Sequence, residues 1–277
     1  AAGFAEEGEG YRLSNEYFDV QIGEYGQIES LKIVGDEFPT NYVMNAENSP
    51  GQDTSGHEWM GELMFKTKAG DAAEWTEALT QSSGSGRTIT RDGNKVIVIY
   101  ENANETRGIK DFKLVETYSL AGDKLQWDIK IINTGSEKLT VGDLGLPMPF
   151  NERWPGGEQI YETRVVDHSF VAKDSSYIYA TRPSGIGKFL LLTPDPSTGA
   201  GFEYQDHWRT SERRSEESAW CQDQAGWANG LNVFYIHSDV IKSTNRGYLE
   251  NTSLELAAGG EKTYTFKFSA ADDERDM

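Results

Sequence analysis

The sequence alternates between apolar and polar residues over many short segments, and this period of two constrains the fold more than any other feature. Phe18, Val20 and Ile22 alternate with polar neighbours, a glycine-containing turn covers 23–26, and a second apolar segment covers 28–33. Successive side chains of a strand point to opposite faces, so an alternating segment forms a strand with one buried face. The pattern therefore predicts a β-hairpin here.

Similar segments recur along the chain, separated by breaks that contain Gly, Pro or Asn. We expect strands at Val96–Tyr100, Phe112–Leu120, Leu125–Ile132, Leu139–Val141, Tyr177–Ala180, Phe189–Leu192, Val233–His237, Leu254–Leu256 and Tyr264–Phe268. Trp127 alternates with Leu125 and Ile129, which places it in the core. Helical spacing is weak throughout, and the good helix formers at 72–74 predict only a short helix or irregular turn near Trp75–Leu79.

So many short strands do not fit comfortably in one open sheet, and two stacked sheets bury both apolar faces. The predicted fold is all-β, a large two-sheet antiparallel supersandwich. A chain of 277 residues can form this as one domain. We expect the domain to cover 1–270, with 271–277 as a charged tail or a linker to a missing domain, and a flexible loop at 81–86.

The net charge of the chain and the length of its apolar segments limit the kinds of partner that it can bind. The chain holds 45 acidic and 26 basic residues, a formal net charge of -19, which disfavours nucleic acid and anionic membranes. Its apolar runs fall short of the roughly 20 residues of a membrane span. Neutral oligosaccharides or polysaccharides are easier to accommodate, although the same charge also serves solubility alone.

Most tryptophans lie in polar, loop-like sequence, where indole rings can stack on sugar rings beside carboxylates and amides. Each ring could equally cover a sheet edge or anchor its own loop. With the polar residues beside them, the candidate carbohydrate-binding residues are Trp59, Glu152, Trp154, Asp206, His207, Trp208, Arg209, Trp220 and Trp227.

Two of these stretches have competing interpretations. The segment 203–209 places acid, imidazole, indole and guanidinium together, as a sugar-contacting loop or as a solvated loop with local ion pairs. Glu203 and Asp206 would act as an acid/base pair only at separations of about 5–5.5 Å or 6.5–9.5 Å. The proline-containing segment 147–154 predicts either a protruding loop or a structural corner.

Signatures of other chemistries are missing from the sequence. The four histidines do not show zinc spacing, and no serine-hydrolase elbow or phosphate-binding loop occurs. Cys221 is the single cysteine and has no recognisable catalytic partner. Asp53 and Glu58 with nearby carbonyls could hold a structural calcium ion, although no Asp-x-Asp-x-Asp-Gly loop occurs. We therefore assign no cofactor and no catalytic residue.

Four segments carry a resemblance to a known family. Leu13–Val20 and Gly26–Ile33 resemble the first hairpin of the N-terminal, galactose-mutarotase-like supersandwich domains that precede the helical barrel in bacterial glucoamylase-like hydrolases and sugar phosphorylases. Pro39–Val43 and Asp143–Asn151 are similar to large uncharacterised bacterial proteins of that architecture. That resemblance implies catalytic carboxylates in a barrel that this chain lacks. It implies an accessory domain of a glycoside hydrolase type of protein, secreted or at the cell surface, with the catalytic domain of the same parent chain as partner.

Two alternatives stay open within this class of fold. An aldose epimerase or a glycoside hydrolase would act alone, and an epimerase requires an Asn-His pair that is missing here. His168 and His237 with Glu250 or Glu255 could imitate its catalytic trio. The other alternative is a sandwich of the polysaccharide-lyase or adhesion type, against which the acidic surface argues.

Overall fold

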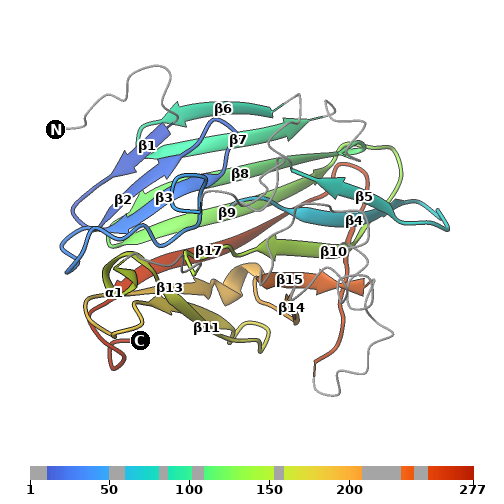
Figure 1. Ribbon diagram of the computed structural model, residues 1–277. Helices are drawn as coiled ribbons and strands as arrows, with labels where there is room; N and C mark the ends of the chain where they lie inside the picture. The colour runs from blue at the N-terminus through green and yellow to red at the C-terminus, as the bar shows by residue number, and fades with distance from the viewer. Residues whose placement is uncertain are drawn as a thin grey trace.

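The strands of the computed structural model pair into three antiparallel sheets (Figure 1). The structure describes residues 11–49, 60–80, 87–101, 109–152, 159–207, 232–239 and 249–277. The predicted all-β sandwich is confirmed. None of the helices within these ranges is long and apolar enough to cross a membrane.

The largest sheet has eight strands and spans the molecule in Figure 1. In spatial order it contains β11 (Val166–Phe170), β12 (Tyr177–Thr181), β13 (Phe189–Pro194), β17 (Glu261–Ala271), β9 (Lys124–Asn133), β8 (Phe112–Ala121), β7 (Lys95–Glu101) and β6 (Arg87–Asp92). Its long central strands bury every second residue along much of their length, which is why their alternation was legible in the sequence.

A six-stranded sheet provides the second layer. It contains β14 (Tyr204–His207), β15 (Asn232–Ser238), β10 (Leu139–Pro147), β4 (Met64–Ala69) and β5 (Thr76–Leu79), and β16 (Leu254–Leu256) pairs with β10. The third sheet contains β1 (Tyr11–Ser14), β2 (Phe18–Ile22) and β3 (Ile28–Ile33). Two single-turn helices lie in the second half of the chain, α1 (Ile160–Thr163) and η2 (Pro196–Thr198).

The main core lies between the sheets and is rich in aromatic rings. Trp127 is fully buried, as predicted, and its ring lies 6.0 Å from that of Tyr118 and 6.2 Å from that of Phe266. A second apolar cluster, which includes Met64, Val233 and Tyr235, is separate from this core. Strands β10 and β15 are therefore buried nearly throughout, and β15 has no exposed residue.

The short helix expected near Trp75–Leu79 is wrong, because Thr76–Leu79 form β5 and pair with β4. Trp75 explains why the chain extends here: its ring lies over Gly142 of β10, where a Cβ atom would come within 2.2 Å of the indole. Lys68 covers the same ring at 4.5 Å from its centre. Tertiary packing thus overrides the helix propensity of the preceding residues.

The other expected strands are present, with β10 longer than its predicted segment. The loop expected at 81–86 lies outside the described residues. At the C-terminus, β17 continues to Ala271, and the acidic residues after it are exposed.

Candidate functional site: a polar seam between β11 and β14

Strands β11 and β14 belong to different sheets, and polar side chains connect them. Ser169 of β11 donates from Oγ to Gln205 Oε1 of β14 at 2.9 Å, and Gln205 Nε2 donates to Asn232 Oδ1 at 2.9 Å. Further along, Lys173 and Phe202 form a backbone bridge. We call the residues along this line the polar seam: Glu152, Asp167, Ser169, Lys173, Glu203 and Gln205.

A cavity of about 470 Å³ opens at the seam. Its lining is Ser169, Phe170, Val171, Glu203, Tyr204, Gln205 and Leu249. Aromatic rings and apolar side chains thus alternate with a few fixed polar groups, the composition that small organic ligands require of a pocket. We refer to it as the seam cavity.

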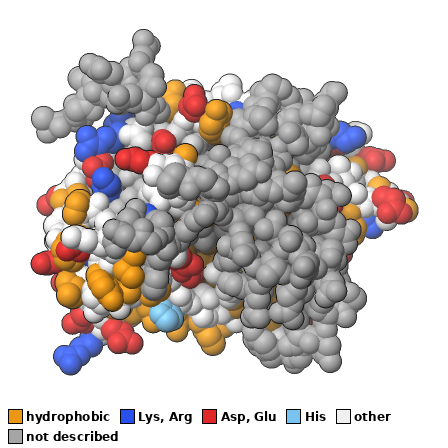
Figure 2. Space-filling model, in the orientation of Figure 1, with side chains coloured by type: hydrophobic (Ala, Val, Ile, Leu, Met, Phe, Trp, Pro, Cys, Tyr) orange, Lys and Arg blue, Asp and Glu red, His pale blue; other side chains and the backbone are white. Residues whose placement is uncertain are grey.

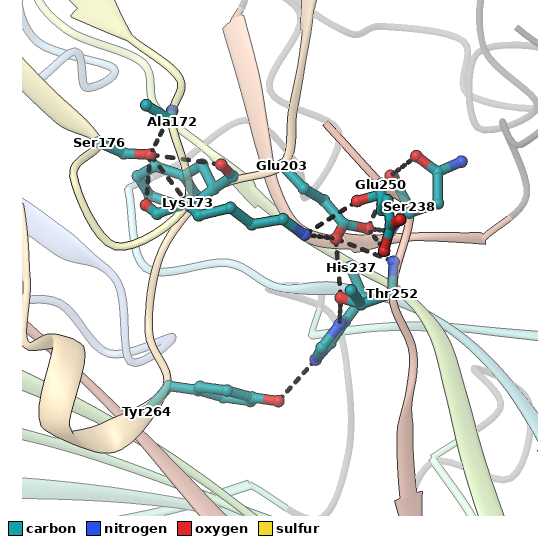
Figure 3. A network of polar contacts seen from close by, with 11 residues as sticks. Ala172, Lys173, Ser176, Glu203, His237, Ser238, Glu250, Thr252 and Tyr264 are labelled. Carbon is teal, nitrogen blue, oxygen red and sulfur yellow. Dashed lines mark hydrogen bonds and ion pairs between the residues drawn. The ribbon is translucent and has the colours of Figure 1, made fainter. Parts of the chain in front are cut away.

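Glu203 holds one end of the seam together (Figure 3). Its carboxylate is 2% exposed. It accepts hydrogen bonds from the backbone N–H of Ser238 at 2.7 Å, from that of Thr252 at 2.9 Å and from both their hydroxyls at 2.9 and 2.7 Å. The Lys173 ammonium lies 2.6 Å from Oε2. One carboxylate therefore ties together three segments that are far apart in the sequence.

The same contacts determine the charge of Glu203. Burial by itself would raise its pKa, but the Lys173 ammonium and the donors of Thr252 and Ser238 outweigh burial and lower the pKa below the usual value. The carboxylate is ionised at neutral pH and its lone pairs are occupied. Glu203 is therefore unsuited to accept a proton from a substrate, and the geometry does not support the hypothesis that pairs it with Asp206 as acid and base.

A chain of hydrogen bonds leads from Glu203 into the core (Figure 3). His237 Nδ1 lies 2.9 Å from Thr252 Oγ1, and Nε2 lies 2.6 Å from the Tyr264 hydroxyl. Burial lowers the pKa of His237 to about 4, so its ring is neutral, with one donor and one acceptor. Thr252 donates its proton to Glu203, hence it accepts from Nδ1–H, and Nε2 accepts from Tyr264. The ionised carboxylate orients every proton in the chain.

Glu152 lies at the other end of the seam, and its pKa is shifted in the opposite direction to that of Glu203. Its Oε1 accepts from the backbone N–H of Asp167 at 2.7 Å. Burial, together with a hydrogen bond to the Asp167 carboxyl group and repulsion from its charge, raises the pKa of Glu152 to about 9. Glu152 thus keeps its proton at neutral pH and can donate it.

The two glutamates have different partners. Glu152 contacts Asp167, whereas Glu203 contacts Lys173, Ser238 and Thr252. The seam therefore combines a fixed anion at one end with a proton donor at the other.

The structure places three of the predicted carbohydrate-binding residues. Glu152 belongs to the seam, Asp206 lies in β14 opposite Val233 and is 3% exposed, and His207 is the last residue of that strand. The remaining six lie outside the described residues: Trp59, Trp154, Trp208, Arg209, Trp220 and Trp227. Asp53, Glu58 and Cys221 also lie outside them.

The structure does not bring together the residues that could imitate the catalytic trio of an epimerase. His168 lies on the solvent face of β11, stacked on Tyr179, whereas His237 belongs to β15 of the six-stranded sheet and is buried against Tyr264. Glu255 pairs with Lys138 at the surface. Among the described residues, no group of three or more His, Cys, Asp or Glu side chains could hold a metal ion.

Three residues that contact the Glu203 carboxylate were not predicted, because their sequence context is ordinary. Lys173, Ser238 and Thr252 are common surface residue types in turns or at strand ends. Lys173 does have a left-handed backbone with φ 56°, unusual for a residue with a side chain, but a sequence does not reveal this.

The fold is similar to that of solved proteins of sugar metabolism. A polysaccharide lyase superposes with a TM-score of 0.67 at 16% identity, over 95% of this chain and 33% of its own. A galactose mutarotase related enzyme from Lactobacillus acidophilus gives 0.56 at 9% identity, over 96% of this chain and 99% of its own. A galactose mutarotase-like protein from Lactobacillus casei gives 0.57 at 13%, over 94% and 99%.

These likenesses support the mutarotase-like part of the predicted resemblance and not the part that named glucoamylases and sugar phosphorylases. The chain spans a third of the length of the polysaccharide lyase. No curated protein matches the sequence. A family model does match, over residues 29–277, and the chain therefore belongs to DUF5695, a family of unknown function.

Proposed function

We propose that this chain is a carbohydrate-binding domain that holds a neutral oligosaccharide or polysaccharide in the seam cavity. The observation that carries the proposal is the lining of that cavity, where Phe170 and Tyr204 accompany the polar groups of Ser169 and Gln205. Aromatic rings stack on the apolar faces of sugars while amides and hydroxyls bind their hydroxyl groups. The likeness to mutarotase-related proteins and to a polysaccharide lyase supports a sugar ligand.

An accessory role fits the seam better than catalysis. The Glu203 carboxylate is saturated by the donors of Ser238, Thr252 and Lys173, so it is not available to a substrate. The ligand is neutral because the Lys173 charge is already paired and the chain carries a net charge of -19, which repels acidic sugars. Figure 2 shows acidic side chains at several places on one face of the molecule. We further propose that the domain serves a secreted or cell-surface glycoside hydrolase whose catalytic barrel is a separate domain.

Affinity electrophoresis in gels that contain neutral α- or β-glucans tests the proposal, with chromatography of the same mixtures to detect products. We expect retention without turnover. Phe170→Ala should abolish retention, because this ring is 52% exposed and lines the cavity. Tyr161→Ala is the matched control, since Tyr161 is 60% exposed on α1 and is not among the residues that line the cavity. Absence of retention on every glucan would refute the proposal.

A second candidate is a stand-alone sugar-acting enzyme, and one observation favours it. Glu152 is protonated at neutral pH beside Asp167, as a general acid must be. If products appear in the same assay and Glu152→Gln abolishes them, the enzymatic function replaces the accessory one.

A further inference from the structure

The solvent face of the eight-stranded sheet carries a group of aromatic rings at one end. They come from β11, β12 and β13, and we call them the aromatic cluster: His168, Phe170, Tyr177, Tyr179 and Phe189. Ring centres are 4.9 Å apart between His168 and Tyr179, 5.9 Å between Tyr179 and Phe189, and 5.8 Å between Phe170 and Tyr177. Tyr179 also stacks on Tyr177, so it is the centre of the group.

This cluster is exposed to solvent. Phe170 is 52% exposed and Tyr177 is 40% exposed. Further along the same sheet face, the outward side chains include polar ones such as Gln126, Asp128 and Lys267, and aliphatic ones such as Ile97, Ile99 and Val115. Contiguous exposed apolar side chains usually mark a binding surface.

The size of the cluster favours a small or narrow ligand over a protein. It covers three neighbouring strands, roughly 10 Å across at about 4.8 Å between strands. A stable protein interface buries about 800 Å² on each partner, which is more than the exposed parts of these five rings supply. Three of the rings carry a hydroxyl or a ring nitrogen, so polar groups accompany the apolar faces, as a sugar ligand requires.

The cluster is continuous with the seam cavity. Phe170 belongs to the cluster and also lines the cavity, and its neighbour Ser169 lies in the cavity wall. Among the described strands, β11 is the last of its sheet. A chain that leaves the cavity can therefore pass around the edge of β11 and continue over the rings of β12 and β13.

We propose that the aromatic cluster and the seam cavity form one extended surface for several consecutive residues of a neutral polysaccharide. The cavity would hold one part of the chain, and Tyr177 and Tyr179 would hold the residues that follow. This inference rests on the proposed function and adds the ligand class: long neutral glycans are bound more tightly than short oligosaccharides.

Calorimetric titration with neutral gluco-oligosaccharides of increasing length, and with the parent polymer, tests the inference. We expect the affinity of the unmodified protein to rise with length. Tyr179→Ala should lower the affinity for the polymer at least about tenfold, or about 1.4 kcal/mol, and leave the shortest bound oligosaccharide unaffected. Tyr161→Ala should change neither. Tyr177→Ala removes an exposed ring of the same cluster and should act in the same direction if Tyr179→Ala unfolds the domain.

The outcomes separate the two proposals. If oligosaccharides bind and Phe170→Ala abolishes their binding, but neither tyrosine variant changes the length dependence, only the extended surface is refuted. If the unmodified protein binds no glycan, both proposals fail. Light scattering covers the remaining case: self-association that Tyr179→Ala abolishes would identify the cluster as a protein interface and overturn the inference.

Discussion

Glu203 and Glu152 lie at opposite ends of one seam and differ in charge although both are largely buried. Glu203 faces an ammonium group and the donors of Ser238 and Thr252, which lower its pKa. Glu152 faces the carboxyl group of Asp167, and its pKa rises to about 9. Burial favours the neutral form at both ends, so the partner decides the outcome. The comparison separates an anion that holds the fold from an acid that can release a proton.

The largest effect is expected from removing the anion. Glu203→Ala leaves the backbone N–H groups of Ser238 and Thr252 without their acceptor inside the protein, and we expect a loss of about 3–5 kcal/mol in unfolding free energy. Urea unfolding measures it. Lys173→Met is the matched variant: Lys173 is 37% exposed, and the buried carboxylate keeps its donors from Ser238 and Thr252, so the loss should be smaller than for Glu203→Ala. Equal losses would show that the ion pair, and not the backbone donors, holds this end.

Glu152 should make the protein less stable as the pH rises. The unfolded chain releases this proton near its ordinary pKa of 4.5 and the folded chain near 9, so the unfolding free energy falls between these values. The slope is at most about 1.4 kcal/mol per pH unit. Glu152→Gln should flatten the curve from pH 5 to 9 in urea titrations. An unchanged slope in this variant would contradict the raised pKa.

His237 should make the protein less stable as the pH falls, over a narrower pH range than that of Glu152. Its pKa falls from 6.5 in the unfolded chain to about 4 in the folded one, so stability is present above pH 6.5 and is lost as the pH falls toward 4. Glu203 adds to the loss below its ordinary pKa of 4.5. Thermal unfolding of His237→Gln between pH 4 and 7 should show a shallower decline than that of the unmodified protein. Parallel curves would refute a neutral imidazole.

The sequence predicted the sheets better than the seam. Strands β8 and β9 were legible because one face of each is apolar and the other polar. Strand β10 is buried on nearly all sides, so only Leu139–Val141 was predicted of a strand that continues to Pro147. Strand β14 is short and polar, and its residues were interpreted as a loop.

The seam could not be predicted, because its members are brought together only by the fold. Lys173 and Glu203 are 30 residues apart, and the sequence drew attention to Glu203 only as a possible partner of Asp206. Glu152 was selected for its place after two prolines, which gave no indication that Asp167 would lie beside it. The aromatic rings of β11 to β13 were interpreted as members of separate strands, since cross-strand register is not visible in a sequence.

The hydrogen bond from Asp167 to Glu152 also affects the edge of the eight-stranded sheet. The last strand of an open sheet presents backbone N–H and C=O groups to which a strand of another molecule can pair. Among the described strands β11 is the last of its sheet, and Glu152 occupies one of its N–H groups. The side chain thus satisfies an edge donor that a further strand would otherwise use.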